Sequence, residues 1–405
     1  MSRISIIAVG SRGDVAPLAG LGAELKRRGH DVAVTAYSPF ASMIMSCGLT
    51  FRELPAALDD GEDPTKGLAA FAAPSGMRTL DAAILRVNAD QATDLLLLSP
   101  FAEMAGHPLA EAKGIPALGV RMQPLSATAA HPPAILGGGN LGARGNKLAA
   151  EFGAGLFDLL YGGVVADLRR SVGLPKVSAR ALRRLRTGAN WTVLHGYSTS
   201  VAPRPADWRT GLEVTGYWRP PRDPSWTPPD ELARFLAAGP PPVFVGLGSV
   251  VVSKKRSRVL SELIVRAAEL AGVRVLIQAG WAGLHAATDG VLTIGDAPHD
   301  WLFPHMAAVA HHCGAGTTAA GLRAGVPTVA LPGYGDGPFW ARRLREIGAC
   351  ATVIPQRRLT AERLADGFRA ALDPALRVTT ERIGAQIRSE DGAARAASII
   401  ERHLR

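Results

Sequence analysis

The residues with the clearest chemical potential lie at positions 307–322, which read AAVAHHCGAGTTAAGL. An apolar run predicts a buried strand that ends in a histidine pair, and a glycine-rich turn then leads into a helix. Gly314 and Gly316 let the backbone approach a ligand closely, while Thr317 and the free amides of the helix start can bind phosphate oxygens. The stretch predicts a site for a phosphate-bearing ligand, although the Walker and G-x-G-x-x-G patterns are absent. The alternative is a turn that only packs the strand on the helix.

Three further loops follow apolar runs and carry polar side chains. Ser249, in the sequence GLGS, is either a second phosphate contact or part of an ordinary turn. Asp336, in PGYGDGPFWAR, could accept hydrogen bonds from sugar hydroxyls or cap the next helix. Asp14, in GSRGD, is open to the same two interpretations: a capping carboxylate would be acidic and a poor base, whereas one that faces a cleft could take a hydroxyl proton.

Short apolar runs alternate with amphipathic stretches along most of the chain, which is typical of an α/β fold with parallel sheets. The expected strands are residues 4–9, 32–35, 94–98 and 117–120 in the first half, and 243–248, 273–278, 291–294, 307–310 and 328–331 in the second. Two doubly wound domains bind ligands beyond the carboxyl ends of their strands. The polar loops are therefore expected to line a cleft between the domains.

The composition changes at residues 198–242, which are rich in proline, tryptophan and charge. Such a stretch is expected to contain an irregular connection between domains and the start of the second domain. It separates a first domain, residues 1–197, from a second domain, residues 243–378. Residues 379–405 are expected to form one long amphipathic helix that could pack back on the first domain.

The chain has 405 residues, 47% of them hydrophobic and 20% charged, which predicts two or three globular domains. No signal peptide is expected. The sequence has no run of about 18 apolar residues, so an integral membrane protein is not expected. The three cysteines are far apart and fit a reducing cytoplasm. The acidic run 59–63 is expected to be an exposed loop, so no metal site is predicted.

The net charge of +10 comes mostly from arginines scattered on the expected helices, with local basic clusters at 180–186, RALRRLR, and 254–258, KKRSR. These clusters are either solvated helix faces or a surface that recruits an anionic lipid or an acidic substrate. No groove-reading motif or aromatic ladder is present, so no nucleic-acid partner is expected. Peripheral contact with a membrane stays open.

The segments GSRGDVAPLAGLGAELKRRGHDV and HHCGAGTTAAGLRAGVPTVALPGYGDGPFWARRL together resemble the nucleotide-sugar-dependent glycosyltransferases of the GT-B fold. The resemblance is to the bacterial natural-product and sterol-glucosyltransferase branch of the UDP-glycosyltransferase superfamily, and it covers essentially the whole chain. It implies two facing Rossmann-like domains, the first for the acceptor and the second for the nucleotide sugar.

The resemblance also implies roles for single residues of the second domain. His312, Gly314, Gly316 and Thr317 match the segment that holds the donor diphosphate, with Ser249 in support.

Other positions match the remaining parts of the donor site and the candidate base. Trp281 matches a tryptophan near the nucleobase, with a core tryptophan as the alternative, and Pro298 and His299 lie in the loop near the base or ribose. Asp336 matches the residue that binds sugar hydroxyls, and Asp14 the candidate general base.

The implied reaction is a single displacement with inversion, in which a UDP- or dTDP-sugar is the co-substrate and no cofactor or metal takes part. Two residues depart from the family pattern. Gly337 stands where glutamine is usual, which favours a donor with fewer hydroxyls, such as a deoxysugar. Cys313 stands where bacterial members have glycine, and it is interpreted as a packing residue and not as a nucleophile.

The acceptor is expected to bind in the loops at 58–80 and 121–139, which are apolar. Ser11, Gln123 and His131 are expected to line this pocket, and His131 is an alternative base. An apolar natural product or a lipid alcohol is the expected acceptor. Two other functions stay open: a catalytically silent sugar-nucleotide-binding accessory protein, and an epimerase that converts the donor without an acceptor.

Overall fold

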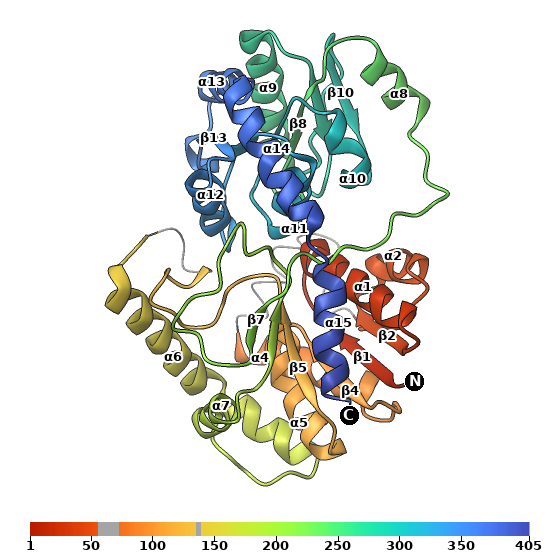
Figure 1. Cartoon of the computed structure of the whole chain (residues 1–405), viewed down its shortest axis with the longest axis vertical. Helices are drawn as coiled ribbons and strands as arrows, with labels where there is room; N and C mark the ends of the chain where they lie inside the picture. Colours follow the sequence, from red (N-terminus) through yellow and green to blue (C-terminus); the bar gives the residue numbers. More distant parts are fainter. Residues whose placement is uncertain (56–72, 135–138, 405) are drawn as a thin grey trace.

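The computed structural model describes residues 1–55, 73–134 and 139–404. Two α/β lobes are stacked along the long axis of the molecule, and the chain crosses between them twice (Figure 1). The first lobe contains a parallel sheet in the order β3-β2-β1-β4-β5-β6-β7, and the second a parallel sheet in the order β10-β9-β8-β11-β12-β13. Two doubly wound domains were expected, and the structure confirms them.

The first sheet consists of β1 Arg3–Ile7, β2 Asp31–Ala36, β3 Thr50–Glu53, β4 Leu95–Leu98, β5 Ala117–Arg121, β6 Val193–His195 and β7 Leu212–Val214. Its helices are α1 Arg12–Arg27, α2 Ala41–Ser46, α4 Pro74–Asn88, α5 Glu103–Lys113, α6 Gly142–Ser171 and α7 Ala179–Gly188. The central strands are buried on both faces, which explains why β4 reads LLLL.

The second sheet consists of β8 Val243–Gly246, β9 Val275–Gln278, β10 Val291–Ile294, β11 Ala308–His311, β12 Thr328–Ala330 and β13 Cys350–Val353. Its helices are α8 Asp230–Ala237, α9 Lys254–Ala271, α10 His299–Leu302, α11 Ala315–Ala324, α12 Gly337–Glu346, α13 Ala361–Ala371 and α14 Pro374–Ser389, and α15 Gly392–Arg402 follows. Short 3-10 turns lie at Ser38–Phe40, Pro100–Ala102, Phe303–His305 and Gln356–Arg358.

The strand order of each sheet reverses at one point, between β1 and β4 in the first and between β8 and β11 in the second. Crossover connections leave in opposite directions at such a point, so a crevice opens beyond the carboxyl ends of the strands. The loops after β1, β8 and β11 all begin at these two crevices. The fold therefore brings together the polar loops that the sequence singled out.

The connection at residues 198–242 is less irregular than expected. Leu212–Val214 form β7 at the edge of the first sheet, and Asp230–Ala237 form α8. The prediction of irregular chain is therefore wrong for β7, because a three-residue strand is too short to show a periodic pattern. Helix α8 lies in the expected start of the second domain.

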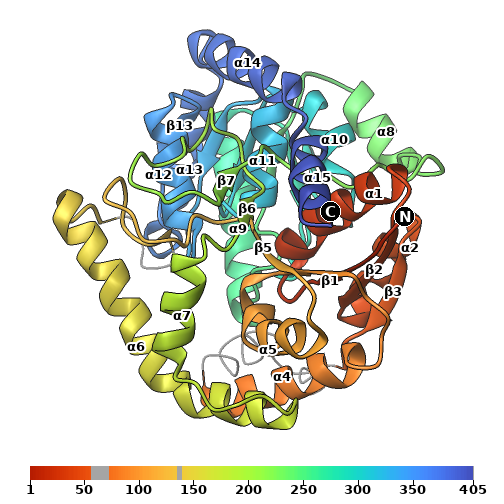
Figure 2. The same ribbon diagram turned by 60° about the horizontal axis from the view of Figure 1, so that its bottom comes forward.

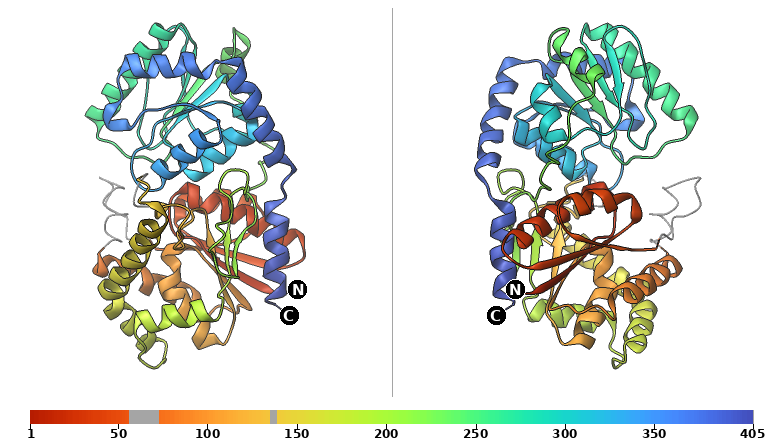
Figure 3. Two further views of the ribbon diagram at one scale, coloured as in Figure 1. Left: turned by 60° about the vertical axis from the view of Figure 1, so that its left-hand side comes forward. Right: turned by 90° about the vertical axis from the view of Figure 1, so that its right-hand side faces the viewer.

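The predicted single helix over 379–405 is also wrong, because the chain forms α14 and α15 with a break at Glu390 and Asp391. Glu390 has an extended backbone and accepts a hydrogen bond from Ser198 Oγ at 2.6 Å. Asp391 caps α15 by accepting from the amide of Ala394 at 3.1 Å. The break lets the chain pass from the second lobe to the first, along one side of the molecule (Figure 3).

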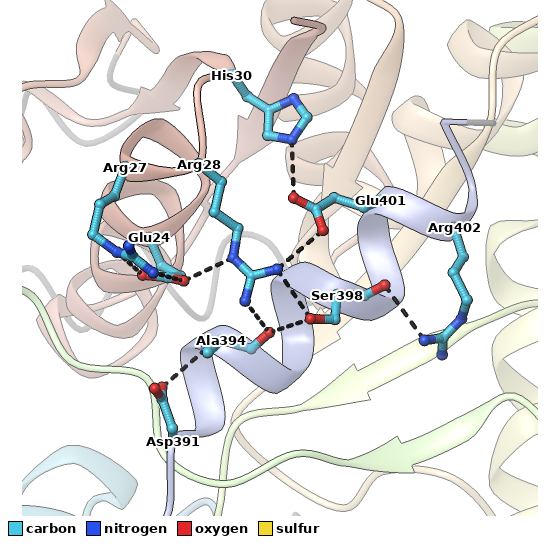
Figure 4. Close-up of polar contacts among 9 residues, drawn as sticks. All are labelled: Glu24, Arg27, Arg28, His30, Asp391, Ala394, Ser398, Glu401 and Arg402. Carbon is cyan, nitrogen blue, oxygen red and sulfur yellow. Dashed lines mark hydrogen bonds and ion pairs between the residues drawn. The ribbon is translucent and has the colours of Figure 1, made fainter.

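The last helix, α15, lies against α1 of the first lobe, and one arginine makes most of the polar contacts (Figure 4). The Arg28 guanidinium donates to Glu24, Glu401, Ser398 Oγ and the carbonyl of Ala394 at distances of 2.8 to 3.0 Å. Its side chain is 21% exposed. The contacts tie the two ends of the chain together.

Replacing Arg28 by alanine is expected to lower the free energy of unfolding by about 1 to 2 kcal/mol, because several charge-assisted hydrogen bonds are lost at a half-buried site. Arg27 is the matched control, since it is 70% exposed and its side chain pairs with Glu24 alone. Urea unfolding of both variants measures the difference. Equal stabilities would show that α15 does not depend on this contact.

Candidate active site

A cavity of about 2070 Å³ lies between the lobes, at the carboxyl ends of both sheets. The first lobe contributes Asp14 and Gln123, and the second contributes Ser249, His312 and Asp336. Every position that the sequence predicted for donor or catalytic contact lines this one cavity. The lining residues among those predicted are Ser11, Asp14, Gln123, Ser249, Trp281, Pro298, His299, His312, Gly314, Gly316, Thr317 and Asp336.

The amino terminus of α11 points into the cavity. Gly314 is its N-cap and has no side chain to satisfy the amides of the first turn, which have no partner within the helix. The start of α1 approaches from the other lobe: a methyl group built on Gly316 would lie 3.8 Å from Cα of Gly13. Two positive helix ends therefore meet here, and an anion fits this position.

His312 is packed between two glycines beside this helix start. A methyl group on Gly248 would lie 2.5 Å from Cε1 of the ring, and one on Gly314 would overlap the ring from another side. Burial lowers the pKa of His312 to about 4, so the imidazole is neutral near neutral pH. Its Nδ1 is buried and has no hydrogen-bond partner among the described residues. A neutral imidazole carries one N–H group, which can donate a hydrogen bond to a phosphate oxygen.

Two loops at the outer end of the cavity carry the predicted nucleobase contacts. The Trp281 amide donates to the Gly248 carbonyl at 3.2 Å, and 47% of the residue is exposed. The alternative of a core tryptophan is therefore wrong. His299 stacks on Phe303 with 4.3 Å between ring centroids, and its Nε2 lies 3.3 Å from Oε1 of Gln278. Burial lowers the pKa of His299 to about 4.

Asp14 accepts hydrogen bonds at the start of α1 and also lines the cavity. The N-cap is Ser11, and not Asp14, whose Oδ2 accepts from the Ser11 amide at 2.9 Å and from Ser11 Oγ at 3.0 Å. The second oxygen, Oδ1, accepts from Gln123 Nε2 at 3.3 Å. Burial raises the pKa of Asp14 above its ordinary value, against the effect of these hydrogen bonds. The expectation that a capping role makes this carboxylate acidic is therefore wrong.

Asp336 comes from the other lobe and also has a raised pKa, first because of burial and further because of the nearby charge of Asp14. Its backbone occupies the N-cap position of α12, but its side chain does not cap the helix. Oδ2 instead accepts from Trp340 Nε1 at 2.9 Å. The Gln123 amide, which donates to Asp14, also lowers the pKa of Asp336, so it lies close to both acidic groups.

The two departures from the family pattern have structural explanations. Cys313 is fully buried, its φ is +67°, and burial raises the pKa of its thiol, so it does not supply a thiolate. Glycine is favoured at such a φ. A methyl group on Gly337 would lie 2.9 Å from the carbonyl oxygen of His312. A glutamine there would require the His312 backbone to shift.

The structure describes only part of the loops that the sequence predicts for the acceptor. Ser11 and Gln123 line the cavity, as expected. His131 does not: its Nδ1 faces the Pro132 carbonyl at 3.1 Å and its ring packs edge-on against Phe339. His131 therefore does not line the described part of the cavity, and its role as an alternative base stays a prediction. Of the predicted acceptor loops, residues 58–72 and 135–138 lie outside the described residues.

Several cavity residues were missed by the sequence interpretation. Phe157 and Tyr161 come from the inner face of α6, where no motif marks them. Arg12 pairs with Asp296 at 2.7 Å and joins the lobes beside the candidate base. The sequence GSRGD contained that arginine, but its partner lies 284 residues away, so the pairing could not be inferred.

No group of three histidine, cysteine or acidic residues within residues 1–55, 73–134 and 139–404 could hold a metal ion. The acidic run at 59–63 lies outside those ranges. The arrangement supplies hydrogen-bond donors and helix amides where an anion would bind, and a half-buried carboxylate that lines the same cavity.

Gly10 makes room for Asp14, because its φ is +144° and a methyl group on it would lie 2.5 Å from Asp14 Oδ2. Gly10→Ala is therefore expected to displace the carboxylate and lower the turnover rate by about 10²-fold. Gly29→Ala is the matched control, since Gly29 also has a positive φ but no atom within 4 Å of the added carbon. An equal loss of turnover in both variants, measured at saturating substrate, would assign the effect to backbone strain alone.

Residues 262–401 match the family model described as the C-terminal domain of erythromycin biosynthesis protein CIII-like proteins. The chain is 34% identical to O-mycaminosyltylonolide 6-deoxyallosyltransferase of Streptomyces fradiae, over 98% of this chain and 97% of that protein. The chain belongs to the family 1 glycosyltransferases. This glycosyltransferase is also 30% identical to a sterol 3-beta-glucosyltransferase of Arabidopsis thaliana, over 99% of its own length and 66% of the plant protein.

Solved structures agree with the fold of this glycosyltransferase. The glycosyltransferase of kitacinnamycin superposes with a TM-score of 0.72 over 100% of this chain and 99% of that one, at 19% identity. VinC in complex with dTDP superposes with a TM-score of 0.70 over 99% of both chains, at 18% identity. The two lobes therefore form a GT-B fold, as the resemblance implied.

Proposed function

We propose that this glycosyltransferase moves a sugar from a dTDP- or UDP-sugar to a hydroxyl of an apolar acceptor, with inversion at the anomeric carbon and without a metal. The observation that carries the proposal is that the half-buried Asp14 carboxylate of the first lobe and the start of α11 of the second lobe line the same cavity. A base for the acceptor hydroxyl and an anion site for the leaving diphosphate suit a displacement in which the acceptor oxygen attacks the anomeric carbon in line with the departing diphosphate.

Each step of the reaction has a residue to support it. Asp14 accepts the proton of the acceptor hydroxyl while the oxygen attacks the anomeric carbon. The bond to the donor diphosphate breaks, and the diphosphate leaves with both electrons. His312, Thr317 and the α11 amides stabilise the negative charge that develops there. Asp336 holds sugar hydroxyls, and Gln123 keeps both carboxylates in place.

The substrate classes follow from the cavity and from the relatives. The relatives include a deoxysugar transferase and a sterol glucosyltransferase by name, and one similar structure holds dTDP. A glycine at 337 is compatible with a sugar that has fewer hydroxyls. The acceptor side is lined by apolar side chains, among them Met43, Met77, Met104 and Met122. Flexible methionines suit a large apolar acceptor.

The proposal is tested by NMR of reactions that contain EDTA, an α-linked dTDP- or UDP-sugar and a panel of hydroxylated macrolactones and sterols. A β-linked product is expected. An α-linked product would contradict inversion, and activity that depends on added Mg²⁺ would contradict the metal-free mechanism. Donor conversion without any acceptor product would favour an epimerase.

A further inference from the structure

The 30-residue helix α6 is packed on one face only. Tyr161, Val164 and Leu168 are buried toward the lobe. On the opposite face, Phe152 is 74% exposed and Leu159 is 79% exposed. Leu148, Leu156 and Leu160 are also exposed on this outer side, and the exposed Leu141 directly precedes the helix, whereas the exposed Phe157 belongs to the inner face. A contiguous apolar face of this kind marks an interaction site.

The same part of the chain is strongly basic. Residues 142–188 contain nine Lys and Arg residues and three Asp and Glu residues, so they carry +6 of the net charge of +10. Helix α7 lies beside α6 at the edge of the first lobe (Figure 2). It exposes Arg180, Arg184 and Leu185. An apolar helix face with adjoining positive charge is the pattern of helices that lie in the surface of an anionic bilayer.

By length and composition, α6 is the one helix among the described residues that could cross a membrane. Its inner face argues against this arrangement. Asp158 pairs with Arg183 of α7 at 2.7 Å, and the buried Arg169 pairs with Glu111 of α5 at 2.6 Å. These contacts hold α6 against the lobe, so only its outer face is free to meet a bilayer.

A second copy of the chain is a poorer partner for this face. A twofold contact through α6 and α7 would place one basic surface against another, and like charges repel when water is removed between them. A bilayer with anionic lipids offers the opposite charge and an apolar layer at once. The charge therefore favours a lipid surface over self-association.

We propose that the α6–α7 surface, formed by the exposed face of Leu148, Phe152, Leu156 and Leu159 and by the exposed arginines of α7, docks on an anionic lipid bilayer. The inner faces of both helices line the cavity that contains Asp14. An apolar acceptor dissolved in the bilayer would then enter the cavity beside α6. This last clause rests on the proposed function, whereas docking itself does not.

The test is sedimentation of the full chain with vesicles of 30% phosphatidylglycerol in phosphatidylcholine, and with vesicles of phosphatidylcholine alone. Wild-type protein is expected to bind the anionic vesicles, and less so in high salt. Phe152→Gln/Leu159→Gln and Arg180→Glu/Arg184→Glu are each expected to lower the partition coefficient by about tenfold or more.

Matched control pairs are available in the second lobe. Leu372→Gln/Val378→Gln removes exposed apolar residues, and Lys255→Glu/Arg258→Glu reverses exposed charges in the other basic cluster. Both are expected to bind vesicles like wild type. Three results would overturn the proposal. They are an equal loss of vesicle binding in the control variants, no vesicle binding by the wild type, and light scattering without lipid that shows self-association which Phe152→Gln/Leu159→Gln abolishes. Binding of dTDP, measured on the same samples, tests the proposed function separately.

Discussion

Replacing Asp14 by asparagine is expected to lower the rate of sugar transfer by about 10³-fold, while the affinity for the donor nucleotide stays within about twofold. The carboxylate lies in the acceptor lobe and has no predicted contact with the diphosphate, so its loss removes proton transfer and not donor binding. Asparagine can still accept from the Ser11 amide, and the start of α1 is preserved. Transfer is measured at saturating donor, and nucleotide affinity by calorimetry.

The pH profile provides a second readout. Burial raises the pKa of Asp14 above its ordinary value of 3.8, so the base form appears only at higher pH. Wild-type kcat/KM should therefore rise with pH through this raised pKa, and the nearby Asp336, whose pKa is also raised, is coupled to Asp14 by charge. The rise should be absent in Asp14→Asn.

As pH rises through the pKa of Asp14, the free energy of unfolding should fall while the transfer activity rises. A raised pKa means that the folded state binds the proton more tightly than the unfolded state, so the stability contributed by Asp14 falls as pH rises from 3.8 through the folded pKa. Asp14→Asn removes the buried charge and should unfold at the same temperature as wild type or higher at neutral pH. Full activity in this variant would exclude Asp14 as the base, and a catalytically silent protein would show no transfer to lose.

Replacing His312 by alanine is expected to weaken binding of dTDP and UDP by about 10- to 100-fold, the range for loss of a hydrogen bond to a charged group. The ring is held between Gly248 and Gly314 next to the α11 amides, so no other side chain can replace it. The pKa of about 4 keeps it neutral, and its contribution should not change between about pH 6 and 8. Calorimetric titration without added metal measures both nucleotides.

His305→Ala is the matched control, since His305 is exposed in the 3-10 turn after α10 and does not line the cavity. It should bind nucleotide like wild type. If His312→Ala binds both nucleotides as tightly as wild type, the diphosphate does not contact this ring, and the donor site must be assigned elsewhere in the cavity.

The sequence predicted the sheets and the donor loops because both have local signals. Buried parallel strands such as β4 and β8 are continuous apolar runs, and the turns that follow β8 and β11 require glycine where His312 is packed. Helix starts have weaker signals: α1 begins at Arg12, before Val15, the first apolar residue of its pattern. The turn before it is capped by Ser11, which the apolar pattern does not show.

Other features depend on contacts distant in sequence. The raised pKa of Asp14 follows from its burial in the folded chain, which outweighs the lowering by hydrogen bonds from Ser11 and Gln123, and this burial cannot be read from the local sequence. The break at Glu390 follows from the passage of the chain between lobes. His131 was assigned to the cavity from its loop alone, but packing on Phe339 directs it elsewhere. Exposure of the outer face of α6 could not be read from an apolar pattern that also suits a buried helix.

The central claim is that the donor diphosphate binds at the start of α11, opposite Asp14. A crystal structure of the protein soaked with dTDP tests it most directly. The account predicts phosphate oxygens within hydrogen-bond distance of His312 and Thr317, with the thymine ring beside Trp281. A diphosphate bound away from α11, or a nucleotide in another part of the cavity, would contradict it.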